Sequence, residues 1–511
     1  IIFFEVFKHY STPRRVELFQ AITKKMQELR LKKEKLTAAQ TIRLFLEQVG
    51  VVGIKAGQVL SEQRGLVSDE VKAELSSLRD QAAPFAKYGV FTYLRTAGLM
   101  EGKPTAQAPF QISEVGECLG SASIKQAHKA WTTERKAVVV KVPRPTIDKN
   151  FQEDVKVLKE VMGALNEAGA KVPKFLLKEV VDACTKEFDF GFEGAAQHDV
   201  DQRLYERKAS VVLPTEAIRL DVPDIAFLLR RGESRVENLQ LLIDEYVPGL
   251  NLAEVEEYQR LSREPLGAAK QQARKTDLEQ KINNIYQEHA GFVRTDYKNF
   301  PTEALRAQLA VDLIEQITVD GVFHADLHSG NIILDLQPKA KRIALIDFGS
   351  VGRSVEVASE GVRDHRAVFR EFILNIIMLK LQLGDAGKLG EIVNEYVKAE
   401  GHTAKTWADR IMELERAQEN IGGFFKELLG EMLAKQAEIH REFKMLLKAM
   451  ASAGGHFDAL SNRVTSVLGE AAAEVMDKGG SIGEVFFKQP EFKKLRPAIE
   501  SSPQLKEMLG L

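Results

Sequence analysis

The stretch of sequence that decides the fold is Phe323–Asn331, which reads FHADLHSGN. Sixteen residues after Asn331, Asp347 begins the tripeptide DFG at the end of the apolar segment Ile343–Ile346. This spacing lets the Asn331 amide and the Asp347 carboxylate reach one Mg²⁺ from opposite sides, while Asp326 faces an acceptor group. Mg²⁺ prefers oxygen ligands and keeps several waters, so two protein ligands and nucleotide phosphates complete its shell.

An upstream lysine extends this pattern to an arrangement for kinase-type phosphoryl transfer. Ala137–Val142 (AVVVKV) predicts an apolar strand whose Lys141 would contact the α- and β-phosphates of ATP. A strand with one lysine is weak evidence by itself, because an edge strand with a solvated lysine looks the same. The order Lys141, Asp326, Asn331 and Asp347 is much more specific. Asp326 and Lys141 are therefore the predicted catalytic residues, and Asn331 and Asp347 the predicted metal ligands.

Composition limits the class of protein. The chain has 511 residues with 71 Lys+Arg and 73 Asp+Glu, so its formal net charge is −2. This balance argues against nucleic acid as the main ligand, because such proteins usually carry a basic surplus. No run of about 18 apolar residues is present, so we expect no membrane-spanning helix. The chain begins at Ile1, which leaves targeting open, and we expect a cytoplasmic, organellar or peripheral membrane protein.

The hydrophobic pattern changes twice along the chain. Helical periodicity runs from Pro13 to about Leu78, and Ala97–Pro109 marks a domain boundary. Three short strands follow over Phe110–Val115, Ser123–Trp131 and Ala137–Val142. One helix is expected from about 174 to 207, and the chain beyond Gly249 is mostly helical. We expect an α+β, bilobal protein-kinase-like fold with a small antiparallel sheet lobe, a large helical lobe and an N-terminal helical extension. The expected domains are 1–108, 109–248 and 249–511.

The phosphate-binding loop is unusual. Neither a Gly-x-Gly-x-x-Gly loop nor a Walker-type Gly-x4-Gly-Lys motif is present. The segment at the corresponding place contains Gly120, Ser121, Ala122 and Ser123, whose small side chains let the backbone approach phosphates. The serine hydroxyls add donors. The alternative is an ordinary hairpin of small residues.

With these motifs in order, the chain resembles the UbiB family of atypical kinases, also called AarF-domain kinases. Lys55–Gln58 (KAGQ) is similar to the family's Lys-x-Gly-Gln motif, and the loop from Gly120 is similar to its alanine-rich loop. Glu187–Phe190 (EFDF) resembles its Glu-x-Asp helix. The chain departs from the family pattern at Gly120 and Ser121, where alanine is usual.

The resemblance also implies roles for the acidic helix. In one continuous helix, Asp189 and Glu193 are four residues apart and share a face. We therefore expect Glu193 to pair with Lys141, and Asp189 or Glu187 to pair with Lys55 near the nucleotide. Gln58 lies three residues after Lys55 and faces the same groove. The alternative for each acid is a solvated helix face. The segment Leu241–Val247 resembles the hinge, where backbone groups near Glu245 and Val247 would bind adenine.

The family resemblance implies that the protein is an ATP- and Mg²⁺-dependent atypical kinase or ATPase that supports isoprenoid quinone or other lipid metabolism. A lipid or quinone precursor and a membrane surface are the expected further partners. Two alternatives stay open. One is a small-molecule phosphotransferase of the aminoglycoside- or choline-kinase type. The other is a nucleotide-switched scaffold without turnover. Residues after 371 carry no readable motif and are expected to complete the helical lobe.

Overall fold

The structure is a computed structural model of the 511-residue chain. It describes residues 6–31, 36–62, 68–76, 78, 87–105, 109–121, 125–143, 147–167, 175–187, 189–212, 217–231, 239–263, 269–288, 296–335, 341–358, 361–380, 384–435, 437–478, 481–500, 506 and 509–511. The chain forms two compact units. The first contains 1–194 and 224–246, and the second contains 195–223 and 247–511. Whether the three expected segments act as separate domains stays a prediction.

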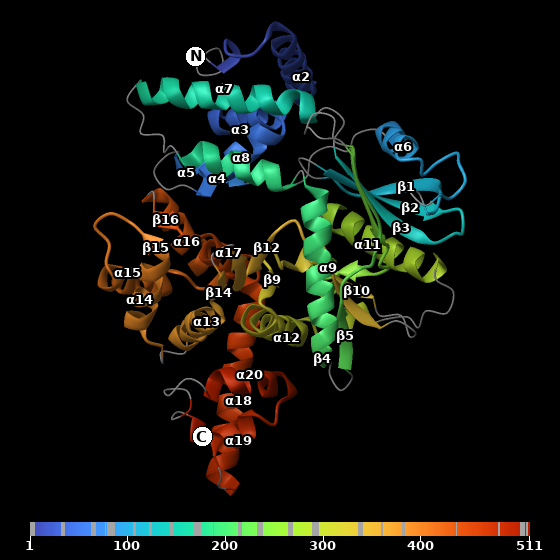
Figure 1. The fold of residues 1–511 in the computed structure, drawn as a ribbon. Helices are drawn as coiled ribbons and strands as arrows, with labels where there is room; N and C mark the ends of the chain where they lie inside the picture. Colours follow the sequence, from blue (N-terminus) through green and yellow to red (C-terminus); the bar gives the residue numbers. More distant parts are fainter. Residues whose placement is uncertain are drawn as a thin grey trace. The chain divides into compact units, whose positions relative to one another are not determined.

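The first unit contains a group of helices and one antiparallel sheet (Figure 1). Its helices are α2 Thr12–Leu31, α3 Ala38–Val49, α4 Val51–Glu62, α5 Asp69–Ser76, α6 Lys87–Thr96, α7 Ile147–Glu167, α8 Phe175–Glu187 and the first turn of α9 Phe190–Arg207. Its strands are β1 Ile112–Ser121, β2 Lys125–Thr132, β3 Ala137–Pro143, β6 Ile225–Arg231 and β7 Leu239–Glu245.

The sheet of the first unit has the order β1-β2-β3-β7-β6, and every neighbouring pair is antiparallel. Burial alternates along β3, as the period of two along a strand requires, and Val138, Val140 and Val142 are almost fully buried. These valines pack in one apolar cluster with Val90 and Leu94 of α6. The three predicted strands are confirmed, and Lys141 lies on the opposite, half-buried face of β3.

Tight packing surrounds the lysine-containing motif in α4. A Cβ atom at Gly57 would lie 2.3 Å from Leu78 Cδ1 and 3.1 Å from Leu46 Cδ1. Only a residue without a side chain lets α4 approach these leucines so closely. The small residues of the motif therefore do permit close packing, against leucine side chains of the same unit.

The single helix expected from 174 to 207 is wrong. The structure has two helices, α8 and α9, and Asp189 before α9 belongs to neither. Asp189 precedes α9, and its carboxylate accepts a hydrogen bond from Phe192 N at 3.1 Å. A short acidic side chain that accepts from a backbone N–H of the first turn is a preferred helix cap. Asp189 and Glu193 therefore do not share the face of one helix, as the sequence argument assumed.

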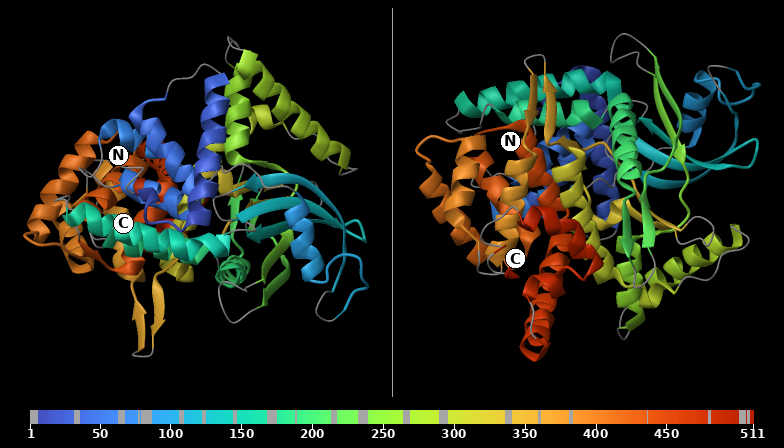
Figure 2. Two further views of the ribbon diagram at one scale, coloured as in Figure 1. Left: turned by 90° about the horizontal axis from the view of Figure 1, so that it is seen from above. Right: turned by 60° about the horizontal axis from the view of Figure 1, so that its bottom comes forward.

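The second unit is mainly helical (Figures 1 and 2). Its helices are the rest of α9, α10 Leu252–Arg263, α11 Ala269–Glu288, α12 Thr302–Glu315, α13 Arg366–Lys380, α14 Ala386–Tyr396, α15 Ala404–Ala417, α16 Ile421–Ala434, α17 Arg441–Ser452, α18 Gly454–Lys478, α19 Ile482–Phe486 and α20 Pro490–Glu500, with the short turns η1 Tyr297–Asn299, η2 Gln316–Asp320 and η3 Ser329–Asn331.

Its strands are short. They are β4 Ser210–Val212, β5 Ala217–Asp221, β8 Leu250–Asn251, β9 Val322–His324, β10 Ile332–Asp335, β11 Arg342–Leu345, β12 Val351–Arg353, β13 Val355–Ala358, β14 Gly361–Asp364, β15 Val397–Lys398 and β16 Glu438–Ile439. One sheet has the order β4-β5-β11-β10-β8, in which β5 and β11 are parallel and the other pairs that the structure records are antiparallel. β13 and β14 form a two-stranded hairpin that the sequence did not predict (Figure 2).

A single apolar core joins the predicted catalytic loop to the C-terminal helices. Phe323 and Phe348 belong to the same buried cluster as Phe372, Phe443 and Phe492. The residues after 371 thus pack onto the helical part, as expected. The α+β class with a small antiparallel sheet, a large helical part and an N-terminal helical extension is confirmed. Among the described helices, none is long and apolar enough to cross a membrane.

Candidate functional site

In the first unit, the predicted ion pair between Lys141 and Glu193 is present. Lys141 Nζ lies 2.8 Å from Glu193 Oε1 and 2.7 Å from Asp244 Oδ2. The exposed side-chain fractions are 14% for Lys141 and 3% for Glu193. A buried carboxylate is costly unless a cation neutralises it, so this pairing fixes the position of the lysine ammonium.

Sheet register explains why two further charged residues join this pair. Ala127 of β2 is opposite Lys141, so Lys125 lies diagonally across the same face. Val139 is opposite Asp244, which gives Asp244 the equivalent diagonal position on β7. Lys125 Nζ lies 2.8 Å from Glu193 Oε2. Glu193 thus separates two lysines that would otherwise repel each other. Sequence reasoning missed Lys125 and Asp244, although their strands were predicted.

The small-residue loop lies between β1 and β2. Gly120 and Ser121 are the last residues of β1, whereas Ala122 and Ser123 lie outside the described residues. A Cβ at Gly120 would meet no atom within 4 Å, so the backbone there has open space beside it. On β2, the Nε2 atom of the buried Gln126 lies 2.7 Å from His128 Nε2. Burial lowers the pKa of His128, which is consistent with a structural hydrogen-bonding role.

The predicted hinge follows β7. Glu245 is the last residue of β7, and its backbone N–H donates to Asp224 O at 2.8 Å. Tyr246 N donates to Ala137 O at 3.4 Å. Val247 belongs to the second unit and is buried. The adenine-binding role of Glu245 and Val247 stays a prediction.

In the second unit, a buried histidine shapes the loop that contains Asp326. His324 Nδ1 accepts a hydrogen bond from Asp326 N at 3.1 Å, so its proton is on Nε2, which donates to Ile346 O at 3.0 Å. Burial lowers the pKa of His324 and keeps the ring neutral. His324 therefore links Asp326 to the residue before Asp347, and its predicted structural role fits this geometry.

The same loop brings the two predicted metal ligands together. Asn331 Nδ2 donates to Asp326 O at 3.0 Å, which leaves Asn331 Oδ1 as an oxygen ligand. Ile346 N donates to Asn331 O at 3.0 Å, so Asn331 is directly bonded to the residue before Asp347. Asp347 has φ +64°, a left-handed backbone conformation that is uncommon outside glycine and concentrates at functional sites. An amide oxygen and a carboxylate fit the oxygen preference of Mg²⁺.

Comparison with known proteins identifies the family. The ABC1 atypical kinase-like domain matches residues 78–367, which is more than half of the chain. The chain belongs to this family. The UbiB-like resemblance expected from the motifs is thereby confirmed.

Several curated relatives bear the name of the UbiB family. "Probable protein kinase UbiB" of Xylella fastidiosa strain M23 is 27% identical over 61% of this chain and 47% of its own length. The protein of that name from Marinobacter nauticus is 24% identical over 82% of this chain and 66% of its own length. This chain thus spans about half to two thirds of these relatives. The solved Rv3197–erythromycin complex of Mycobacterium tuberculosis covers 79% of this chain and 87% of its own, with 19% identity and a TM-score of 0.40, too low to support an argument.

One C-terminal helix, for which the sequence predicted only packing, contacts the predicted catalytic loop. Ser452, the last residue of α17, donates from Oγ to Asp326 Oδ1 at 2.8 Å. Lys448 Nζ, one turn earlier, lies 2.9 Å from Ser350 Oγ, and Ser350 O accepts from Ala325 N. A serine 126 residues away in sequence gives no signal that it would meet Asp326.

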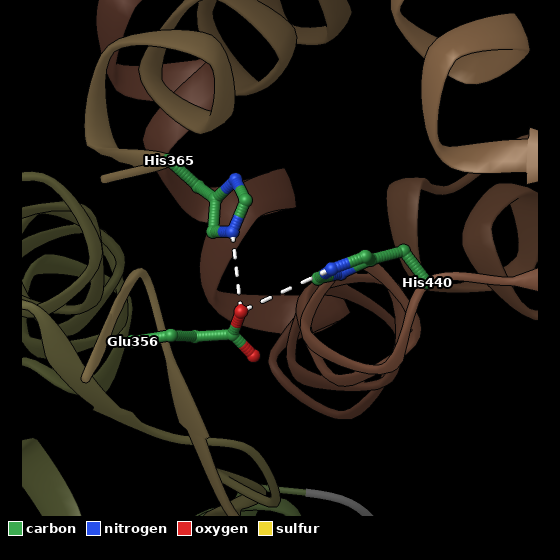
Figure 3. Close-up of side chains that lie close together, drawn as sticks. All are labelled: Glu356, His365 and His440. Carbon is green, nitrogen blue, oxygen red and sulfur yellow. Dashed lines mark ion pairs between the residues drawn. The ribbon is translucent and has the colours of Figure 1, made fainter. Parts of the chain in front are cut away.

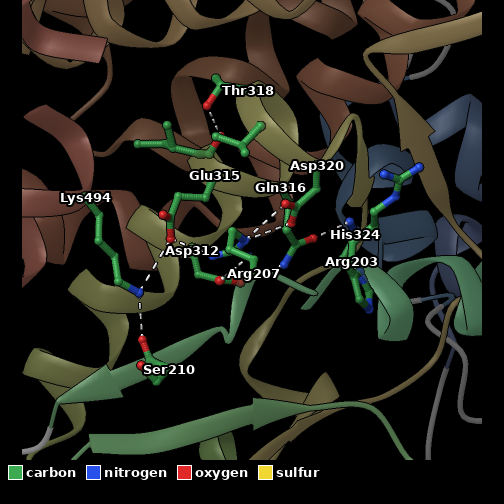
Figure 4. A network of polar contacts seen from close by, with 12 residues as sticks. Arg203, Arg207, Ser210, Asp312, Glu315, Gln316, Thr318, Asp320, His324 and Lys494 are labelled. Atoms are coloured by element: carbon green, nitrogen blue, oxygen red, sulfur yellow. Dashed lines mark hydrogen bonds and ion pairs between the residues drawn. The ribbon is translucent and has the colours of Figure 1, made fainter. Parts of the chain in front are cut away.

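A charged network supports the other side of this loop (Figure 4). Arg207 at the end of α9 pairs with Asp312 at 2.7 Å, Glu315 at 2.6 Å and Asp320 at 3.0 Å. Burial alone would lower the pKa of Arg207, but the three carboxylates outweigh it and raise that pKa. Gln316, within the same turn, accepts a hydrogen bond from His324 N at 3.0 Å. α9 is thereby tied to the strand that leads into the catalytic loop.

The Lys55 motif lies in the first unit. The Lys55 side chain is only 8% exposed, which excludes the exposed helical lysine that composition alone would favour. Gln58 Nε2 donates to Leu78 O at 2.5 Å, so this side chain holds the chain after α5. Asp189 caps α9, and the Glu187 side chain lies outside the described residues. The pairing of Lys55 with Asp189 or Glu187, and the gating role of these residues, stay predictions.

If Lys55 pairs with Asp189 or Glu187 as predicted, Lys55→Ala should lower the free energy of unfolding by about 3–5 kcal/mol, because the change would leave that carboxylate without its cation. Urea unfolding followed by circular dichroism measures the loss. Lys156→Ala is the matched control, because the Lys156 side chain is 72% exposed. A loss for Lys55→Ala no larger than that of the control would contradict the buried pairing.

Proposed function

We propose that this chain binds ATP with Mg²⁺ and transfers the terminal phosphoryl group to water or to a small lipid-like acceptor. The Lys141–Glu193 ion pair carries the proposal, with a 2.8 Å contact at a carboxylate that is 3% exposed. Kinase-type transfer needs this pair in place, because the glutamate holds the lysine where it contacts the α- and β-phosphates. The family membership supports the same reaction class.

Each remaining residue has a role that fits its contacts. Gly120, Ser121, Ala122 and Ser123 would donate backbone and hydroxyl hydrogen bonds to phosphates, and the backbone near Glu245 and Val247 would hold adenine. Bound Mg²⁺ would neutralise phosphate charge between Asn331 Oδ1 and the Asp347 carboxylate. Asp326 would accept the proton of the attacking hydroxyl while the new P–O bond forms, the bond from the γ-phosphorus to its bridging oxygen breaks, and ADP leaves.

Support for a lipid acceptor comes from the family resemblance. We therefore propose isoprenoid quinone or another lipid as the metabolic context. Peripheral membrane contact and the cellular compartment stay predictions.

Asp347→Asn should abolish Mg²⁺-dependent ATP binding while the fold is retained, because it removes the charged metal ligand. Isothermal titration calorimetry with and without Mg²⁺ measures the change. Asp409→Asn on the exposed face of α15 is the matched control. Unchanged Mg·ATP affinity in Asp347→Asn would remove this residue from the metal site.

Ser452→Ala should lower kcat by about 10- to 100-fold without changing Mg·ATP affinity, because a lost hydrogen bond to a charged group costs about 1.5–3 kcal/mol. Asp326→Asn should lower kcat further, by about 10²–10⁴-fold. ATP turnover and calorimetry separate kcat from binding, and Ser452→Thr, which keeps the hydroxyl, should restore the rate. Ser466→Ala on the exposed side of α18 is the control. Normal turnover in Ser452→Ala would show that α17 does not position Asp326.

A further inference from the structure

Three potential metal ligands of the second unit, two from the β13–β14 hairpin and its end and one from the start of α17, converge (Figure 3). Glu356 lies on β13, and His365 directly follows β14. His440 is the residue before α17. Among the described residues, these three form the group of His, Cys, Asp and Glu side chains whose ligand atoms all lie within 4.8 Å of one another.

The distances between the ligand atoms suit one small cation. Glu356 Oε2 lies 3.5 Å from His365 Nε2 and 3.9 Å from His440 Nε2. Zn²⁺ binds nitrogen and oxygen at about 2.0–2.2 Å in a tetrahedron, so two of its ligands lie about 3.3–3.5 Å apart. Small rotations of the His440 and Glu356 side chains would bring their 3.9 Å separation into this range.

His365 is oriented as a ligand. Its Nδ1 lies 2.7 Å from Tyr396 Oη, and its buried Nε2 makes no hydrogen bond to the described residues. A metal-binding histidine commonly uses its other ring nitrogen for such an outer contact, which fixes the ring. Phe369 stacks on His365 at 5.5 Å between ring centroids and restricts the ring further.

His440 now caps α17, and metal binding at its Nε2 would replace this cap contact. His440 Nδ1 accepts a hydrogen bond of 3.3 Å from Glu442 N, which caps α17. A metal on Nε2 requires the imidazole proton on Nδ1, so this long cap bond would be exchanged for a metal bond. Asparagine at this position keeps a cap acceptor but removes the Nε2 ligand.

We propose that Glu356, His365 and His440 bind a divalent transition metal, with Zn²⁺ the best match. Two imidazoles and one carboxylate favour Zn²⁺ over Mg²⁺, which takes oxygen ligands. The side chains are 24%, 13% and 30% exposed, so an ion can enter and a water can complete the tetrahedron. The ion would join the hairpin to the start of α17. This site shares no residue with Asn331 and Asp347, and it does not depend on the proposed ATP chemistry.

Calorimetry with ZnCl₂ on the full chain, stripped with EDTA and held in excess Mg²⁺, tests the site. We expect one Zn²⁺ per chain and a higher melting temperature with Zn²⁺. Removing a residue that only hydrogen-bonds to a metal ligand lowers metal affinity by up to about 100-fold. Removing a ligand itself should cost more, so Glu356→Gln, His365→Asn and His440→Asn should each weaken Zn²⁺ binding by more than about 100-fold. Melting without metal shows whether each variant folds.

Two controls keep the result specific. His198→Asn removes an exposed imidazole on α9 and should leave Zn²⁺ affinity unchanged. Asp347→Asn should also retain Zn²⁺ binding, because it alters only the separate Mg²⁺ ligands. The proposal is overturned if the chain binds no Zn²⁺, or if folded cluster variants bind it as tightly as the His198→Asn control. Loss of Zn²⁺ binding in Asp347→Asn alone would also overturn it.

Discussion

The constraint on which the first unit depends is the burial of one carboxylate. Glu193 can be stable at 3% exposure only if cations neutralise it, and Lys125 and Lys141 do so at 2.8 Å each. Asp244 balances the second lysine, so the group contains two positive and two negative charges. Its members come from β2, β3, β7 and the first turn of α9. Sheet register and helix start must therefore both be correct for the lysine ammonium to be in place.

In the second unit, hydrogen bonds rather than a buried charge group hold the predicted catalytic loop. Neutral His324 joins Asp326 to the segment before Asp347 through hydrogen bonds at both ring nitrogens. Arg207 forms ion pairs with three carboxylates of α12 and of the turn before β9. Ser452 of α17 donates a hydrogen bond to Asp326. The residues proposed for chemistry are thus held by others that lie far away in sequence. α17 thus contacts the predicted catalytic loop besides packing in the core.

Sequence was most informative where spacing alone determines geometry. The catalytic loop, the DFG segment and the three strands could be predicted, because motif order and the period of two along a strand are local properties. Lys125 and Asp244 could not, because diagonal neighbours depend on strand register. The helix break at Asp189 was missed, because the short polar side chain that caps α9 was interpreted as a helix-face residue. Glu356, His365 and His440 meet only through tertiary packing, which no local pattern reveals.

A double-mutant cycle on Lys141 and Glu193 tests the central claim most directly, namely that Glu193 serves the nucleotide through Lys141. Mg·ATP affinity is measured by calorimetry for Lys141→Met, Glu193→Gln and the double variant, after circular dichroism shows that each is folded. The account predicts strong coupling, about 0.5–3 kcal/mol, with the double variant no weaker than Lys141→Met alone. Losses that simply add would contradict it, because the two residues would then act independently.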